Sequence, residues 1–289
     1  MPWQVYACIT LLSFTLCGLG CRRLSEERVT PSVLLFVILL AGSFYFLGGI
    51  LFRQLPVPPL AALPWIFSMA VVCWIGNILQ TISNHRAPNP GFTTAIIGVQ
   101  SPFVALAAIF MFQDSLNWLK FAGMLVCLVG LMLLSWKESK GAKGERGWVI
   151  FGVIAMVLIG WNTLMYRQLG LMGVAPDWIN FGMMFGACGM NFIHTAGTQK
   201  PLPWGEGYKV KTIWLWFALC ILGSTLGSAC QAIAFREAPN PGYPISLISC
   251  DGMLTSLFAW KFFGHALTRR QMGGVLLCLL GLIVVAWGK

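Results

Sequence analysis

The stretch RAPNPGFTTAI, residues 86–96, returns almost unchanged as EAPNPGYPISL, residues 237–247, 151 positions later. Each copy lies between two long apolar runs. Proline removes a backbone donor and glycine tolerates unusual backbone angles, so the shared Pro-Asn-Pro-Gly is expected to end one helix and begin the next. A duplicated break at a fixed interval indicates a chain built from two related halves.

The apolar runs around these breaks indicate a membrane protein. Of the 289 residues, 57% are hydrophobic and only 10% are charged, and the mean hydropathy is +0.77. A soluble domain carries about 25% charged residues, and about 20 helical residues cross a bilayer. We therefore expect an all-α membrane protein with ten transmembrane helices, near residues 3–20, 32–52, 62–83, 91–112, 118–136, 147–166, 177–196, 212–234, 242–263 and 270–287.

The internal repeat divides the chain into two equal sets of helices. A shift of 151 aligns residues 80–136 with 231–287 without a gap, and about a third of the pairs are identical. The predicted domains are residues 1–137 and 147–289, with five helices each, joined by a basic linker at 138–146. Because five is odd, the second half must enter the membrane from the opposite face, which predicts two inverted five-helix repeats.

The positive charge of the chain is a topology signal. The 19 Lys and Arg outnumber the nine Asp and Glu, giving +10, but nearly all the basic residues lie in loops. We therefore expect the lipid bilayer and a small molecule as partners and no nucleic acid, with the chain a monomer or weak homodimer in a bacterial inner membrane. Fourteen of the 19 lie in loops after the odd-numbered helices, and this bias places both termini outside the cytoplasm.

Motifs for catalysis, metal binding or cofactor binding are missing from the sequence. It contains no G-x-S-x-G, H-E-x-x-H, Walker-type or G-x-G-x-x-G pattern, so we expect neither an enzyme nor a cofactor. The ten cysteines include no C-x-x-C and have no histidine at ligand spacing. They are interpreted as small apolar packing residues, not metal ligands or disulfides.

The repeated break has residues suited to starting a helix. Asn89 and Asn240 are good N-cap residues, and Pro90 and Pro241 suit the first helical position. A well-built turn would use the same residues, but the breaks would also set the angle of two cavity-lining helices. The predicted hinges and helix breaks are Pro88, Asn89, Pro90, Gly91, Pro102, Pro239, Asn240, Pro241, Gly242 and Gly252.

The last helix of each half carries a family resemblance. The segments FAGMLVCLVGLMLLSW, residues 121–136, and QMGGVLLCLLGLIVVAW, residues 271–287, resemble the EamA repeats of the drug/metabolite transporter superfamily. The resemblance covers essentially the whole chain, although Asp114 and His265 stand where the family commonly has Glu. It implies a ten-helix secondary transporter of small metabolites with a central cavity lined by both halves.

Two repeat-mates are the leading candidates for a binding site. Asp251 falls within the ninth apolar run and its mate in the fourth is Gln100. A charge near the bilayer centre costs roughly 2.5–3.5 kcal/mol on insertion scales, so it calls for a reason. Pro102 and Gly252 should weaken the two helices at equivalent depth. Asp251 is expected to carry a proton or accept a substrate amine, unless it is only a protonated or helix-bridging structural group.

Further polar and aromatic groups in the apolar runs complete the predicted site. Gln80 and Gln231 are repeat-mates near the ends of the third and eighth helices. Amides also hold membrane helices together, and tryptophans also form interfacial belts. The predicted substrate-binding residues are Gln100, Asp251, Asn77, Gln80, Gln231, Asn162, Trp161 and Trp74.

The sequence therefore favours a secondary transporter with alternating access. The expected substrate is a small polar or amphiphilic metabolite such as an amino acid, with export the favoured direction and protons one candidate driving force. Two alternatives stay open. One is a carrier of anionic metabolites such as phosphate esters or nucleotide sugars, and the other is an accessory membrane protein that transports nothing.

Overall fold

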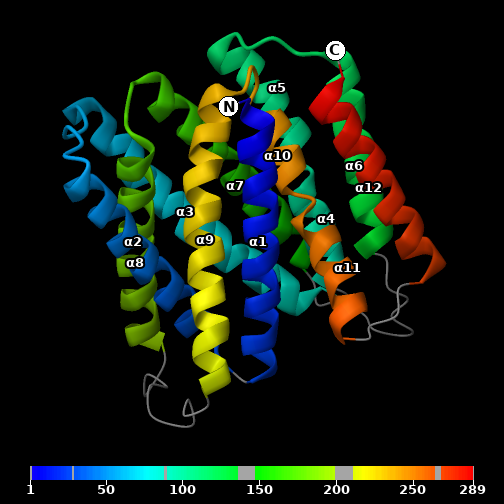
Figure 1. Ribbon diagram of the computed structural model, residues 1–289, viewed down its shortest axis with the longest axis horizontal. Helices are drawn as coiled ribbons and strands as arrows, with labels where there is room; N and C mark the ends of the chain where they lie inside the picture. Colours follow the sequence, from blue (N-terminus) through cyan, green and yellow to red (C-terminus); the bar gives the residue numbers. More distant parts are fainter. Residues whose placement is uncertain are drawn as a thin grey trace.

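The computed structural model describes residues 2–27, 29–87, 90–135, 147–198, 211–263 and 268–288, and all regular structure in these ranges is helical. The helices stand side by side, with both chain termini at the same end of the bundle (Figure 1). The predicted all-α class is confirmed. The elements are α1 Trp3–Glu26, α2 Pro31–Phe52, a short 3-10 helix Leu60–Ala62, α3 Leu63–Arg86, α4 Pro90–Gly98, α5 Gln100–Phe112, α6 Trp118–Ser135, α7 Trp148–Leu171, α8 Pro176–Thr198, α9 Lys211–Glu237, α10 Gly242–Ile248, α11 Asp251–Phe263 and α12 Arg269–Trp287.

The helices have the length and composition of membrane spans. Among the described residues, seven segments are long and apolar enough to cross a membrane, and Trp118–Leu134 is apolar but shorter. Two of the ten predicted spans are absent from this set: α8, which carries Asn180 and Asn191, and the broken segment that contains Asp251. The multi-pass membrane protein is confirmed, and the tally of ten spans stays a prediction.

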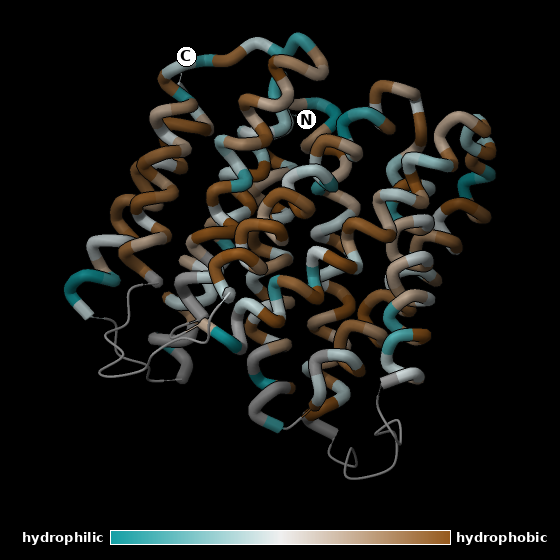
Figure 2. Tube along the Cα trace, turned by 180° about the vertical axis from the view of Figure 1, so that it is seen from behind, coloured by the Kyte–Doolittle hydropathy of each residue, from teal (hydrophilic) through white to brown (hydrophobic). Residues whose placement is uncertain are grey.

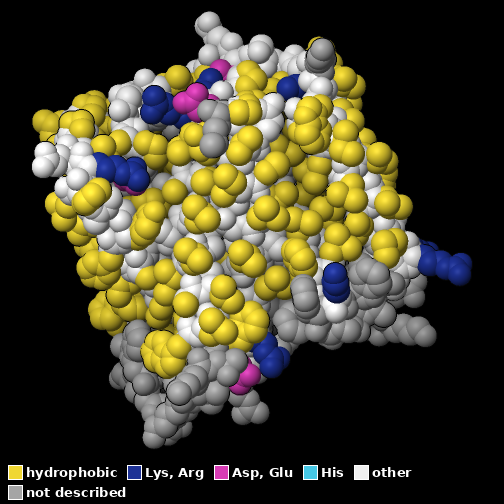
Figure 3. Space-filling view, viewed as in Figure 1, with side chains coloured by type: hydrophobic (Ala, Val, Ile, Leu, Met, Phe, Trp, Pro, Cys, Tyr) yellow, Lys and Arg dark blue, Asp and Glu magenta, His cyan; other side chains and the backbone are white. Residues whose placement is uncertain are grey.

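The outer surface is apolar where lipid would contact it. The side chains of Phe52, Phe67 and Phe110 are 91%, 69% and 86% exposed. Hydrophobic side chains cover the middle of the face in Figure 3, with charged groups toward its ends, and the chain trace in Figure 2 is most apolar between those ends. So large an apolar surface marks a membrane interaction.

The fourth and ninth predicted helices are each broken in two. The helix predicted at 91–112 is interrupted at Val99, between α4 and α5. The helix predicted at 242–263 is interrupted at Ser249 and Cys250, between α10 and α11. The predicted helix breaks at Pro102 and Gly252 thus lie three and two residues after these interruptions. Since 99 and 250 differ by the repeat interval of 151, the two breaks fall at equivalent positions.

The last helices of the two halves, α6 and α12, cross in close contact. The Cys127 Sγ donates to the Cys278 carbonyl at 3.6 Å, and the Cys278 Sγ donates to the Cys127 carbonyl, also at 3.6 Å. A Cβ on Gly130 would lie 2.8 Å from the Gly274 carbonyl oxygen, and only glycine permits this approach. Residue 130 lies opposite 274, 127 opposite 278 and 123 opposite 281, so the two helices are antiparallel. The contact is symmetric, because each cysteine makes the same hydrogen bond to the equivalent residue of the other half.

The remaining long helices also pair across the halves. The largest contacts join α1 with α9, α3 with α7 and α2 with α8. In the repeat, α1 corresponds to α7 and α3 corresponds to α9, so the α1–α9 and α3–α7 pairs are equivalent. Such reciprocal contacts are typical of two units related by a two-fold axis. The core is therefore formed between the halves.

Candidate functional site

The break in the first half lies beside a proline, which lacks a backbone donor. Pro102 has no N–H for the carbonyl of Gly98 one turn earlier, and the Ser101 hydroxyl donates to that carbonyl at 3.3 Å instead. The helix restarts at Gln100, so Pro102 lies in the first turn of α5, where its missing N–H is tolerated. The carbonyl left without a backbone donor at the first break is thus hydrogen-bonded by a neighbouring side chain.

The break in the second half contains the predicted carboxylate. Asp251 is the first residue of α11, not a mid-helix residue as predicted, because the helix stops at Ile248. Its Oδ1 accepts the N–H of Gly252 at 2.6 Å. The N-terminal end of a helix interacts favourably with negative charge. Its side chain is only partly buried.

The two breaks contact each other. The Gln100 Nε2 donates to the Ser249 Oγ at 3.5 Å, and Ser249 lies two residues before Asp251. Gln100 is 6% exposed, and its Oε1 is buried without a hydrogen-bond partner among the residues that the structure describes. A buried acceptor with no partner costs free energy unless a further group satisfies it. The described contacts thus join Gln100 to the break beside Asp251, and not to the carboxylate itself.

The second copy of the repeated motif connects the two halves. Asn240 is fully buried, its Oδ1 accepts the Gly242 N–H at 2.9 Å, and its Nδ2 donates to the Ala105 carbonyl at 3.1 Å. A Cβ on Gly242 would lie 2.5 Å from the Ala105 Cβ, so glycine is required here. The helix begins at Gly242, so the prediction of Pro241 as its first residue is wrong. The side chain of Asn240 thus accepts the hydrogen bond from the Gly242 N–H at the start of this turn.

The other predicted hinge residues lie at separate points along the chain. Pro88 and Asn89 lie outside the described residues. Pro90 and Gly91 are the first two residues of α4, and Pro239 lies between α9 and α10. Gly252 is the second residue of α11.

The predicted amides and one tryptophan have mixed surroundings. The Asn77 Nδ2 donates to the Cys73 carbonyl of its own helix at 2.7 Å, which is a local contact. The Asn162 Oδ1 and the Trp74 Nε1 are buried without hydrogen-bond partners among the described residues. The Trp74 ring lies edge-on to the His194 ring, with centroids 5.8 Å apart. Asn162 and Trp74 therefore keep polar atoms available to a further group.

The last three predicted site residues are partly buried. Gln80 lies on α3 and Gln231 on α9, two helices that pack against the opposite half. Trp161, on α7, packs against the largest apolar cluster. Within the described part of the chain, these side chains and Gln100 are not joined by hydrogen bonds into one constellation.

Sequence reasoning missed a buried ion pair at one end of the bundle. The Arg167 Nη2 lies 3.1 Å from the Asp114 Oδ1, and the two side chains are 12% and 8% exposed. The Arg167 Nη1 also donates to the Arg236 carbonyl at 2.6 Å. The signal that could have revealed the pair is Asp114, at the position where the EamA repeats that the chain resembles commonly have Glu. The pair joins residues of both halves.

Burial sets the protonation behaviour of this pair. It raises the pKa of Asp114 above its ordinary value, although the charge and hydrogen bond of Arg167 act to lower it. Asp114 lies in the segment after α5, outside the helices. Its carboxylate thus depends on Arg167 to stay ionised.

A second buried network ties α7, α8 and α9 together. The Tyr166 hydroxyl donates to the Asn180 Oδ1 at 2.7 Å, and the Asn180 Nδ2 donates to the Ser228 carbonyl at 3.3 Å. Tyr166 and Asn180 are 2% and 0% exposed. These groups satisfy one another and act as structural contacts between helices.

Comparisons with known proteins agree with this arrangement of paired halves. A solved crystal structure, described only as that of a protein, matches 99% of this chain and 99% of its own with a TM-score of 0.80 at 15% identity, which shows a shared fold. No curated protein matches the sequence. The family model for the EamA-like transporter family matches twice, at residues 1–136 and 146–287. Since both matches together span nearly the whole chain, it belongs to the EamA-like transporter family.

Proposed function

We propose that this protein is a secondary transporter that exports a small polar or amphiphilic metabolite, such as an amino acid, by alternating access. In this proposal ten spans form two inverted halves in a bacterial inner membrane, and the substrate binds where the two broken helices meet. Membership of a transporter family supports the transport class.

The observation that carries the proposal is the contact between the two breaks. Broken helices in transporters expose backbone groups to a binding site near the membrane midplane. Here the breaks fall at equivalent positions of the two halves and touch through Gln100 and Ser249. Because Gln100 and Ser249 belong to different halves, movement of one half against the other would alter this contact and a substrate bound beside it.

Asp251 is the residue proposed to bind the substrate amine or a coupling proton. It begins α11, is partly exposed, and pairs with no basic side chain in the described part of the chain. A carboxylate in an apolar surrounding gains from a cationic partner. An amine on the substrate, or a proton, supplies that partner.

The charges also favour this substrate class over anionic metabolites. The buried cation between the halves, Arg167, is already paired with Asp114. A phosphate ester or nucleotide sugar would need basic groups able to contact it, as Arg and Lys do in phosphate sites. Because Arg167 already pairs with the Asp114 carboxylate, its guanidinium is not available to contact a phosphate.

The test is counterflow of labelled amino acids in proteoliposomes, together with a thermal-shift screen against metabolites. Wild-type protein should exchange at least one amino acid, and the variant Asp251→Asn should exchange it much more weakly. Asp177→Asn is the matched control, because Asp177 is a carboxylate at the start of another helix, paired with Arg53 at 3.2 Å. Equal activity in all three proteins would remove Asp251 from the site, and a lack of any counterflow would favour the accessory protein.

A further inference from the structure

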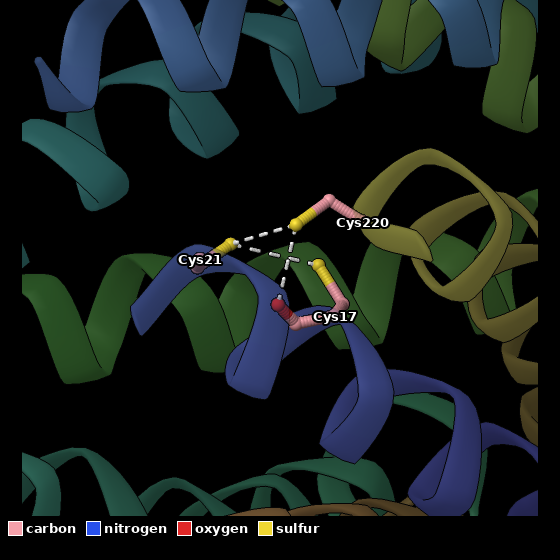
Figure 4. Close-up of side chains that lie close together, drawn as sticks. All are labelled: Cys17, Cys21 and Cys220. Atoms are coloured by element: carbon pink, nitrogen blue, oxygen red, sulfur yellow. Dashed lines mark hydrogen bonds between the residues drawn. The ribbon is translucent and has the colours of Figure 1, made fainter. Parts of the chain in front are cut away.

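Three cysteine thiols meet between α1 and α9. The Sγ atoms of Cys17 and Cys21 are 3.8 Å apart, and that of Cys21 is also 3.8 Å from the Sγ of Cys220. All three sulfurs lie within 4.8 Å of one another, and Figure 4 shows them facing a common point. Cys17 and Cys21 are one helical turn apart on α1, and Cys220 comes from the other half of the chain.

Two glycines bring the helix backbones close enough for this meeting. A Cβ on Gly20 would lie 2.5 Å from the Cys220 Sγ, and one on Gly223 would lie 2.5 Å from the Ser13 carbonyl oxygen. The cluster is lined by apolar side chains including Phe217 and Leu34. Cys220 is fully buried and the two cysteines of α1 are partly exposed. Cys21 ends the apolar span Trp3–Cys21, so the cluster can be reached from the edge of the membrane.

The spacing of the sulfurs fits one metal ion. A metal–sulfur bond of about 2.3 Å places tetrahedral thiolate sulfurs about 3.8 Å apart and trigonal ones about 4.0 Å apart. The two shortest separations in the cluster are both 3.8 Å. Simple packing could bring two thiols this close. Here three thiols from two helices converge on one point, as the ligands of a metal ion do.

We propose that Cys17, Cys21 and Cys220 form a binding site for a soft, thiophilic metal ion, with Cu(I) as the physiological occupant. Thiolates select soft ions, and structural Zn²⁺ sites take four protein ligands. In the described part of the chain, the cluster has three such side chains and no fourth His, Cys, Asp or Glu. Cu(I) is stable with three thiolates, and binding releases the displaced thiol protons to water.

The site would clamp the two halves of the protein together. One helix of each half supplies ligands, so the ion bridges the α1–α9 contact. This inference needs only the thiol geometry and holds whether or not the protein transports amino acids. The proposal departs from the expectation that all ten cysteines are packing residues, for these three alone.

The test is an anaerobic titration of purified, reduced protein with Cu(I) against a chromogenic Cu(I) chelator. Wild-type protein should bind one Cu(I), and Cys17→Ser and Cys220→Ser should each weaken binding at least tenfold. The matched control is Cys188→Ser, because Cys188 is also buried between helices of opposite halves and donates to a backbone carbonyl, as Cys220 does, but lies outside the cluster. The control should bind as wild type does, and Zn²⁺ should compete poorly.

A second measurement on wild-type protein protects the test against misfolded variants. X-ray absorption at the copper edge should show three sulfur neighbours at about 2.3 Å, and Cu(I) should raise the melting temperature of wild type but not of Cys220→Ser. Equal Cu(I) affinity in wild type and Cys220→Ser would overturn the proposal. So would tighter binding of Zn²⁺, or a Cys21–Cys220 disulfide that persists under reducing conditions.

Discussion

In the first half of the chain the helix stops at Val99 and resumes with Gln100 and a proline, whereas in the second half it stops at Ser249 and Cys250 and resumes with Asp251. A proline lies beside the first break, where it removes a backbone donor. The second break has no proline at the equivalent position, where Met253 stands. The broken shape is therefore a property of the fold and is reached by different local means.

The two halves also differ in where they place carboxylates. The first half has an amide at its break, Gln100, and a carboxylate beyond α5, Asp114; the second half has Asp251 at its break, and His265, outside the described residues, as the mate of Asp114. Related backbones thus carry different charges. The two break regions are therefore chemically distinct, although their backbones are related.

The largest effect is expected from breaking the ion pair at one end. Arg167→Met should lower the free energy of unfolding by roughly 3–5 kcal/mol, because it leaves the buried Asp114 carboxylate without its partner. Chemical denaturation in detergent measures this. The control is Arg53→Met, whose side chain is 63% exposed where it meets Asp177, and for which less than about 1 kcal/mol is expected. Equal losses in both variants would contradict the buried pair.

The same variant should acquire a distinctive pH dependence. Burial already raises the pKa of Asp114 and Arg167 opposes this, so without Arg167 the pKa rises further. The folded state then binds a proton more tightly than the unfolded state, so the stability of Arg167→Met should increase as the pH falls and be lost as the pH rises above the ordinary aspartate range. Melting temperatures across pH 4–8, expressed relative to wild type, would show this slope, and a flat difference would count against it.

The next largest effect is expected from moving the carboxyl group from one break to the other. Asp251→Asn should weaken substrate exchange by about 10–100-fold, the value of roughly 1.5–3 kcal/mol for a hydrogen bond to a charged group. The double variant Gln100→Glu/Asp251→Asn should recover part of the loss, because position 100 adjoins the same break. A double variant no better than the single one would show that the two breaks are not interchangeable.

A smaller effect is expected from the amide itself. Gln100→Ala removes one neutral hydrogen bond to Ser249 and should weaken exchange by about 0.5–1.5 kcal/mol, or two- to tenfold. Concentration dependence of counterflow measures it. Ser249→Ala removes the same bond from the other side and should have the same effect; a large difference between the two would mean that the bond is not what matters.

The smallest effect is expected from Pro102→Ala, which restores the backbone N–H that proline lacks. Pro102→Ala lies in the first turn of α5, where the helix does not need that N–H, and should change the free energy of unfolding by less than about 1 kcal/mol. Since the second half breaks without a proline, exchange should persist. Loss of exchange in a stable Pro102→Ala protein would show that proline, and not the fold, maintains the first break.

Much of this arrangement is visible in the sequence, and the missing parts have identifiable causes. Helix spacing, the duplicated Pro-Asn-Pro-Gly and the last-helix glycines predict the class, the repeat and the family. The sequence marked Gly252 as a weak point but did not show that α11 begins one residue earlier, at Asp251; packing against α5 at Ala105 and Gln100 accompanies this break. The Asp114–Arg167 pair and the Cys17–Cys21–Cys220 cluster each join residues far apart in the chain. Residue spacing within one helix cannot reveal such contacts.

The most direct measurement is a cross-link between the two breaks. Gln100→Cys/Ser249→Cys, in a Cys250→Ala background, places one thiol on each side of the 3.5 Å contact, and a short bis-methanethiosulfonate reagent should link them, as mass spectrometry of the peptides would show. The account predicts that the linked protein stops exchanging substrate and that dithiothreitol restores exchange. Failure to link these positions in folded protein, or full exchange by the linked protein, would contradict it.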